Sequence, residues 1–115
     1  MTAQGHPRAT FHRAIERGNL LVAETVLREI GRPTLTELLA LTGLIAHRDP
    51  RRHERVAARW LFRYLQEHDR ATITEAALAA TALAALGGPT HDDAYATLEA
   101  MAERASRRPF APGVA

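Results

Sequence analysis

Apolar residues recur every three or four positions along most of the chain, which is the spacing of one face of an α-helix. Glycine and proline interrupt the pattern at Gly18, at 31–33 and at 87–89. No segment shows the apolar–polar alternation or the β-branched enrichment that is typical of a strand. The pattern therefore predicts six helices, over residues 11–18, 20–30, 35–47, 49–70, 73–86 and 91–107.

The connections between these helices are short, so consecutive helices should pack as antiparallel neighbours. The resulting hairpins cover roughly residues 10–30, 34–70 and 73–107. We expect an all-α fold, either an orthogonal bundle or a short α-solenoid-like arrangement, and the sequence does not choose between the two. Residues 10–108 form the expected single domain, and residues 1–9 and 109–115 are expected to be disordered tails.

Residues 49–70 carry the most distinctive pattern of the chain. Asp49 is a good N-cap residue and Pro50 suits the first helical position, so one long helix should begin here. At 100° per residue, the apolar half of this helix holds Val56, Ala57, Trp60, Leu61, Tyr64 and Leu65. The other half holds four arginines, which we call the arginine ridge: Arg52, Arg55, Arg59 and Arg63.

Two other helices have well-marked beginnings. Thr34 with Glu37, and Thr72 with Glu75, have the spacing of a capping box. The helix at 35–47 is apolar on most sides and should be buried on most sides, and Gly43 weakens it by about 1 kcal/mol unless a neighbour packs closely there. The alanine-rich helix at 73–86 should lie at the centre of the domain or at a subunit contact, where it would form a homodimer.

The composition places few limits on function. The 115 residues carry a formal net charge of +2, and all fifteen basic residues are arginine, which raises the calculated pI to about 9.9 without a large excess of positive charge. The chain has no cysteine, so disulfides and thiolate metal sites are excluded. The beginning of the chain has no apolar signal-peptide core, and no apolar run reaches the length of a membrane span. We expect a cytoplasmic protein without a membrane partner.

The residues that usually carry catalysis are scarce. There is no cysteine or lysine, and the one serine, Ser106, lies near the C-terminal end. No phosphate-binding loop or nucleophile-elbow motif is present, so we expect no enzyme activity and no cofactor. A small metal site at His47, Asp49 and His53 is a third alternative, although the spacing matches no known helical metal motif. We therefore expect no metal.

Residues 34–44, TLTELLALTGL, resemble the first helix and turn of bacterial helix-turn-helix regulators. In those proteins a second helix follows the turn and reads the major groove of DNA. Ala40 and Gly43 are one residue closer together here than in that pattern, and the next helix begins later. The resemblance implies DNA binding through residues 34–63, with Arg51, Arg52 and Arg55 as base or phosphate contacts.

The arginine ridge is the most specific candidate site in the sequence. If the ridge has only a structural role, neighbouring glutamates or solvent pair with its guanidinium groups. If it has a functional role, an acidic partner or a phosphate backbone binds to them. Arginine and tryptophan are both enriched at protein interfaces, so Trp60 would extend the site if its ring were exposed. The partner-binding candidates are Arg52, Arg55, Arg59, Arg63 and Trp60.

Three runs of the chain together resemble a group of small all-helical actinobacterial proteins of unassigned function. The runs are FHRAIERGNLLVAETVLREIG, LTELLALTGLIAHRDPRRHERVAARWLFRYLQE and TEAALAATALAAL, within residues 11–86. The most specific part is Asp49 and Pro50 followed by Arg55, Ala58, Arg59, Trp60 and Arg63. The resemblance implies a helical domain in the cytoplasm and no particular reaction.

The sequence thus favours a non-enzymatic helical interaction module that binds a protein partner through the arginine ridge. The alternative is a DNA-binding transcriptional regulator of the helix-turn-helix type, using residues 34–63.

Overall fold

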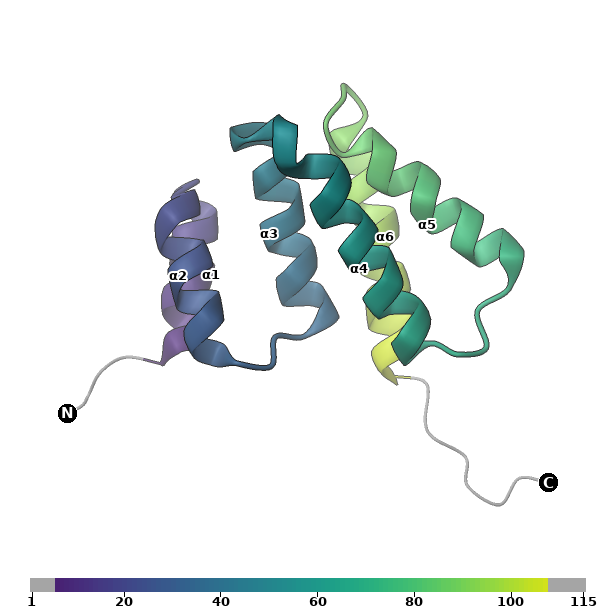
Figure 1. Ribbon diagram of the computed structural model, residues 1–115, viewed down its shortest axis with the longest axis horizontal. Helices are drawn as coiled ribbons and strands as arrows, with labels where there is room; N and C mark the ends of the chain where they lie inside the picture. The colour runs from purple at the N-terminus through teal and green to yellow at the C-terminus, as the bar shows by residue number, and fades with distance from the viewer. Residues whose placement is uncertain (1–5, 108–115) are drawn as a thin grey trace, which may run out of the picture.

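The computed structural model describes residues 6–107, and these form six α-helices and one short 3₁₀ helix (Figure 1). The elements are α1 (Pro7–Glu16), α2 (Leu20–Ile30), α3 (Leu35–Arg48), η1 (Pro50–Arg52), α4 (His53–Glu67), α5 (Ile73–Ala85) and α6 (His91–Arg107). No strand is present in this range, so the predicted all-α class is confirmed. No helix in the same range is long and apolar enough to cross a membrane.

Both predicted capping boxes are present. The amide of Glu37 donates to Thr34 Oγ1 over 3.0 Å, and the amide of Thr34 donates to Glu37 Oε1 over 2.8 Å. Thr72 and Glu75 form the same pair of bonds at the start of α5. These reciprocal bonds satisfy backbone donors that the first turn of a helix leaves unpaired, and they fix where α3 and α5 begin.

Helix α1 begins earlier than the sequence pattern predicted. Pro7 occupies a first-turn position, and Thr10, which was expected to cap the helix, instead donates its hydroxyl to the His6 carbonyl. A proline suits this position because its fixed φ angle is already helical. Positions 7–9 therefore belong to a helix and not to a tail, whereas residues 1–5 and 109–115 of the expected tails lie outside the described residues.

The predicted long helix at 49–70 is wrong at both ends. The Asp49 side chain makes no capping bond, and the chain first forms the 3₁₀ helix η1, in which the Arg52 amide donates to the Asp49 carbonyl over 2.9 Å. Helix α4 then ends at Glu67, because His68 leaves the helical path and is buried, 6 % exposed, with its ring edge against Tyr64. The α-helix is thus shorter at both ends than the sequence pattern alone indicates.

Helix α3 lies between two groups of helices (Figure 1). On one side, α1 and α2 pack against it through a small apolar cluster that includes Phe11, Ala23 and Leu27. On the other side, α4, α5 and α6 surround a larger cluster built around Trp60, Tyr64 and Leu98. This arrangement confirms that α3 is buried on most of its sides.

The packing also explains the glycine in α3 and corrects the position of α5. A Cβ atom at Gly43 would lie 3.2 Å from the ring of Tyr95, so α6 approaches α3 closely at this point. Helix α5 lies at the outer side of the larger cluster, with Ile73 89 % exposed and Leu78 49 % exposed. Of the two expected positions for α5, the centre of the domain is therefore wrong and α3 takes that place, whereas the subunit contact stays a prediction.

Candidate interaction surface

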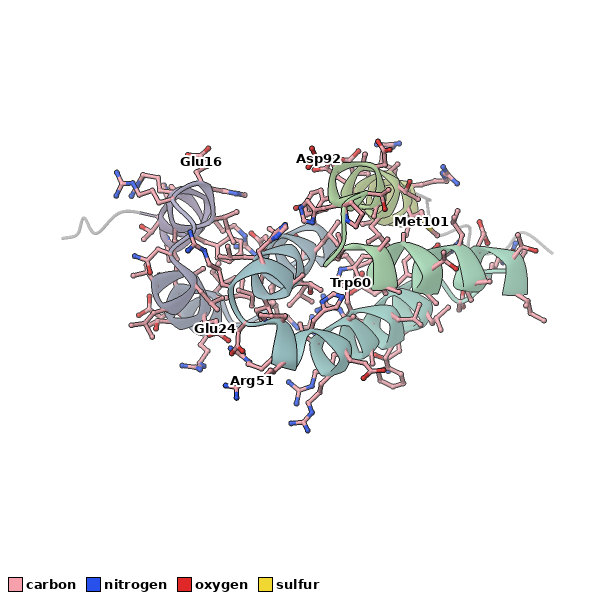
Figure 2. The ribbon with its side chains drawn as sticks, turned by 90° about the horizontal axis from the view of Figure 1, so that it is seen from above. Glu16, Glu24, Arg51, Trp60, Asp92 and Met101 are labelled. Carbon is pink, nitrogen blue, oxygen red and sulfur yellow. The ribbon has the colours of Figure 1, made fainter. Side chains whose placement is uncertain are left out.

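The apolar side of α4 determines which of its arginines face solvent. Ala57, Trp60 and Tyr64 are buried against the larger cluster, so the opposite side of the helix points outward. Arg55 and Arg59 lie on that outer side, and Arg51 precedes them by one four-residue step in η1. In Figure 2, Arg51 projects from the edge of the molecule, on the side that also carries Glu24.

Two arginines of the ridge bind other parts of the molecule. Both terminal nitrogens of Arg52 donate to the carboxylate of Glu24 on α2, and one of them also lies 3.6 Å from Asp49. This hydrogen-bonded pair lowers the pKa of Glu24 and raises that of Arg52, because each charge stabilises the other. Arg52 therefore ties the start of α4 to α2, and it is not free for a partner.

Arg63 has a comparable structural role. Its Nη2 donates to the backbone carbonyl of Pro33 over 2.7 Å, and its Nε donates to Glu67 one turn later on α4. The bond to Pro33 holds the loop between α2 and α3 against α4. Like Arg52, Arg63 is already paired within the fold.

The remaining arginines are different. Arg51, Arg55 and Arg59 are all exposed, and within residues 6–107 none of them forms an ion pair or a side-chain hydrogen bond. We call these three residues the arginine face. From the sequence, Arg51 was named only as a candidate DNA contact. The four-residue spacing of positions 51, 55 and 59 was the signal that could have placed Arg51 on the arginine ridge.

Trp60 is not available to a partner. Its side chain is 2 % exposed, and its indole Nε1 donates to the backbone carbonyl of Leu35 over 2.9 Å. Its ring stacks on Tyr64 with 5.5 Å between the ring centroids, and Figure 2 shows it between the helices. The exposure on which Trp60 depended as a partner-binding candidate is therefore not met, because the apolar half of the helix takes it into the core beneath the arginine face.

A shallow groove runs beside the arginine face, with α3 as its floor and α2 and α4 as its walls. One hollow of this groove has a volume of about 170 Å³ and is lined by Glu24, Leu38, Leu41, Thr42, Ile45, Arg52, Val56, Arg59 and Trp60. A second hollow of about 280 Å³ shares Glu24 and Leu41 with the first and continues to Leu27, Arg28, Gly31 and Pro33. The sequence pattern does not reveal this groove, because its lining comes from separate helices and from the loop after α2.

The three residues of the alternative metal site have separate partners. His53 Nε2 donates to the Leu83 carbonyl over 2.8 Å, and Asp49 faces Arg52. His47 Nε2 lies 3.0 Å from His91 Nδ1, which is 2.6 Å from the Leu86 carbonyl. Among the described residues, no three histidine, aspartate or glutamate side chains are close enough together to hold a metal ion.

No protein-family model, no curated protein and no solved structure matches this chain. The resemblance to small helical actinobacterial proteins therefore stays a prediction. The arginine face and the groove are the features of the structure that bear on function.

Proposed function

We propose that this protein is a non-enzymatic interaction module that binds an acidic protein partner through the arginine face. The observation that carries the proposal is the contrast within one helix surface. Arg52 and Arg63 are paired inside the fold. Arg51, Arg55 and Arg59 form no ion pair or side-chain hydrogen bond among residues 6–107, and the exposed Glu54 that lines the same hollow leaves them in excess. Like charges one turn apart destabilise a helix by roughly 0.2–0.5 kcal/mol per pair. The arginine face therefore weakens the folded chain slightly while it creates a positive potential that attracts acidic surfaces.

The test uses charge reversal with a matched control. The double variant Arg55→Glu, Arg59→Glu changes the net charge by the same amount as Arg104→Glu, Arg107→Glu on α6, where both side chains are also exposed. Proteins captured by the parent chain from lysate are purified, and their direct binding to all three proteins is measured. The proposal expects a captured protein that binds the parent and the α6 variant and loses at least tenfold in affinity for the α4 variant. Equal binding to all three would refute it.

A second candidate function is DNA binding through residues 34–63. It is favoured by Arg51 and Arg55, which are exposed near the start of α4, as contacts to a phosphate backbone or to bases require. The third proposed contact, Arg52, is occupied by Glu24, so it could bind DNA only after that ion pair broke. Fluorescence anisotropy of a labelled DNA duplex at low and at physiological salt tests this function, because phosphate binding weakens steeply as salt rises. Absence of binding at low salt would refute it.

We also propose a second copy of the chain as the partner of α5. The exposed residues of this helix are all uncharged: Ile73, Thr74, Ala77, Leu78, Ala80, Thr81 and Ala84. A twofold dimer brings one surface against itself, and an uncharged surface can do so without like-charge repulsion. Light scattering over a range of concentrations should show a dimer that Leu78→Glu dissociates. A monomer at every concentration would refute the proposal.

A further inference from the structure

The groove between α2 and α4 combines an apolar floor with positively charged rims. Leu38 and Leu41 on the floor and Val56 on the wall are only partly buried, so they still offer apolar surface to a ligand. Arg59 lies on the α4 rim, and Arg28 lies on the α2 rim of the adjoining hollow. The charge of Glu24 between them is neutralised by Arg52. The remaining positive charge therefore lies on both walls of the groove, at Arg28 on α2 and at Arg59 on α4.

The groove has room for the side chains of a peptide. Its two hollows measure about 170 and 280 Å³ and meet at Glu24 and Leu41, so each can take an apolar side chain of the same bound peptide. Along α3, the floor from Leu38 to Ile45 is about 10 Å long at about 1.5 Å per residue. That length matches about two turns of a bound helix, whose apolar residues would recur at intervals of three and four positions.

We propose that this groove binds an acidic amphipathic helix of a protein partner. The apolar residues of that helix lie between α2 and α4, against Leu41 and Val56. Its carboxylates lie against Arg28 on one rim and Arg59 on the other, and Arg55 precedes Arg59 by one turn of α4. The inference rests on the proposed function, since the same arginines attract the partner, and it adds the partner's secondary structure and the apolar contacts. A nucleic acid would use the arginines through its phosphates and would leave the apolar floor uncovered.

The probe is a displayed library of helix-forming peptides rich in alanine and glutamate, with four positions of one stripe randomised. The full chain is the selection target, and the affinities of enriched peptides are then measured in solution. We expect leucine, isoleucine, methionine or phenylalanine to be enriched along the stripe. Val56→Gln and Leu41→Gln should each weaken binding at least tenfold, because each removes apolar contact surface without changing the charge.

The matched control is Leu65→Gln, the same chemical change on α4 outside the groove, at a side chain that is 37 % exposed. This variant should bind the peptides with unchanged affinity. Leu41 also packs on the small apolar cluster, so circular dichroism and a thermal melt establish first that each variant is folded. If Leu41→Gln does not fold, Val56→Gln decides the test alone.

The outcomes separate this inference from the function on which it rests. If no peptide is enriched, or if enriched peptides bind both groove variants as tightly as the parent, the groove proposal is overturned. If a protein captured from lysate still binds the parent and loses affinity for Arg55→Glu, Arg59→Glu, the arginine face keeps its proposed function without the groove. If a labelled duplex binds through those arginines and no peptide is selected, both proposals fail.

Discussion

Replacement of Trp60 by phenylalanine tests whether this residue belongs to the core or to an interface. The indole is almost fully covered, and its Nε1 donates to the Leu35 carbonyl. Loss of that hydrogen bond costs about 1 kcal/mol. Phenylalanine also has two fewer buried ring carbons, at about 0.8 kcal/mol each. Trp60→Phe should therefore lower the free energy of unfolding by about 2–3 kcal/mol, out of the roughly 5–15 kcal/mol that is typical of a folded domain.

Urea denaturation followed by far-UV circular dichroism measures this change without depending on the tryptophan signal. The thermal midpoint should fall by about 10–20 °C, since 1 kcal/mol shifts it by about 4–8 °C in a domain of this size. Phe62, 64 % exposed on the same helix, provides the control. Phe62→Ala should change the stability by less than about 0.5 kcal/mol.

The same variant tests the position of Trp60 relative to a partner. At a temperature where Trp60→Phe is fully folded, it should bind a partner of the arginine face within about twofold of the parent, because the ring is covered. A binding hot spot would instead cost about 2 kcal/mol or more. A stable Trp60→Phe protein with greatly weakened partner binding would show that our placement of this residue is wrong.

Three further predictions concern single contacts. Glu24→Gln should lower the free energy of unfolding at neutral pH by up to about 1 kcal/mol, a small effect because Arg52 is partly exposed. Because the pKa of Glu24 is lowered in the folded state, this difference from the parent should disappear as the pH falls below the usual pKa of a glutamate. Urea titrations at several pH values measure it. Thr72→Ala should cost about 1 kcal/mol through loss of the capping box of α5, and an unchanged thermal midpoint would contradict that role. Burial raises the pKa of Tyr95 to about 12. The stability that the neutral Tyr95 side chain contributes should therefore be complete below about pH 10 and be lost as the pH rises toward 12. A comparison of the stability of Tyr95→Phe with that of the parent across this range would detect the loss.

The parts of the fold that could be predicted from the sequence depend on neighbouring residues in the chain. The capping boxes at Thr34 and Thr72 need only a threonine and a glutamate three positions later, and the structure confirms both. The burial of α3 follows from apolar residues on most sides of one helix. Each of these features is set within a single helix, so the pattern was sufficient.

The parts that could not be predicted depend on contacts between distant residues. Arg52 meets Glu24, 28 positions earlier, and Arg63 meets the carbonyl of Pro33, 30 positions earlier. The sequence placed these two arginines on the same ridge as Arg55 and Arg59, and it could not distinguish paired from unpaired ones. The sequence pattern also missed η1, whose last residue, Arg52, is the one that binds Glu24 on α2.

The position of α3 explains why the candidate surface lies where it does. This helix packs one side against the cluster with α1 and α2 and another side against the cluster with α4, α5 and α6. Between the two clusters, a strip around the partly buried Leu38 and Leu41 lines the groove. A ligand on that strip touches α2 and α4 at once, and it therefore bridges the two clusters on the side where the Glu24–Arg52 ion pair already joins them. A ligand that binds only the folded state raises its stability by mass action. An occupant of the groove should thus protect the junction of α2 with α4 against local opening, and one that binds the arginine face alone should not.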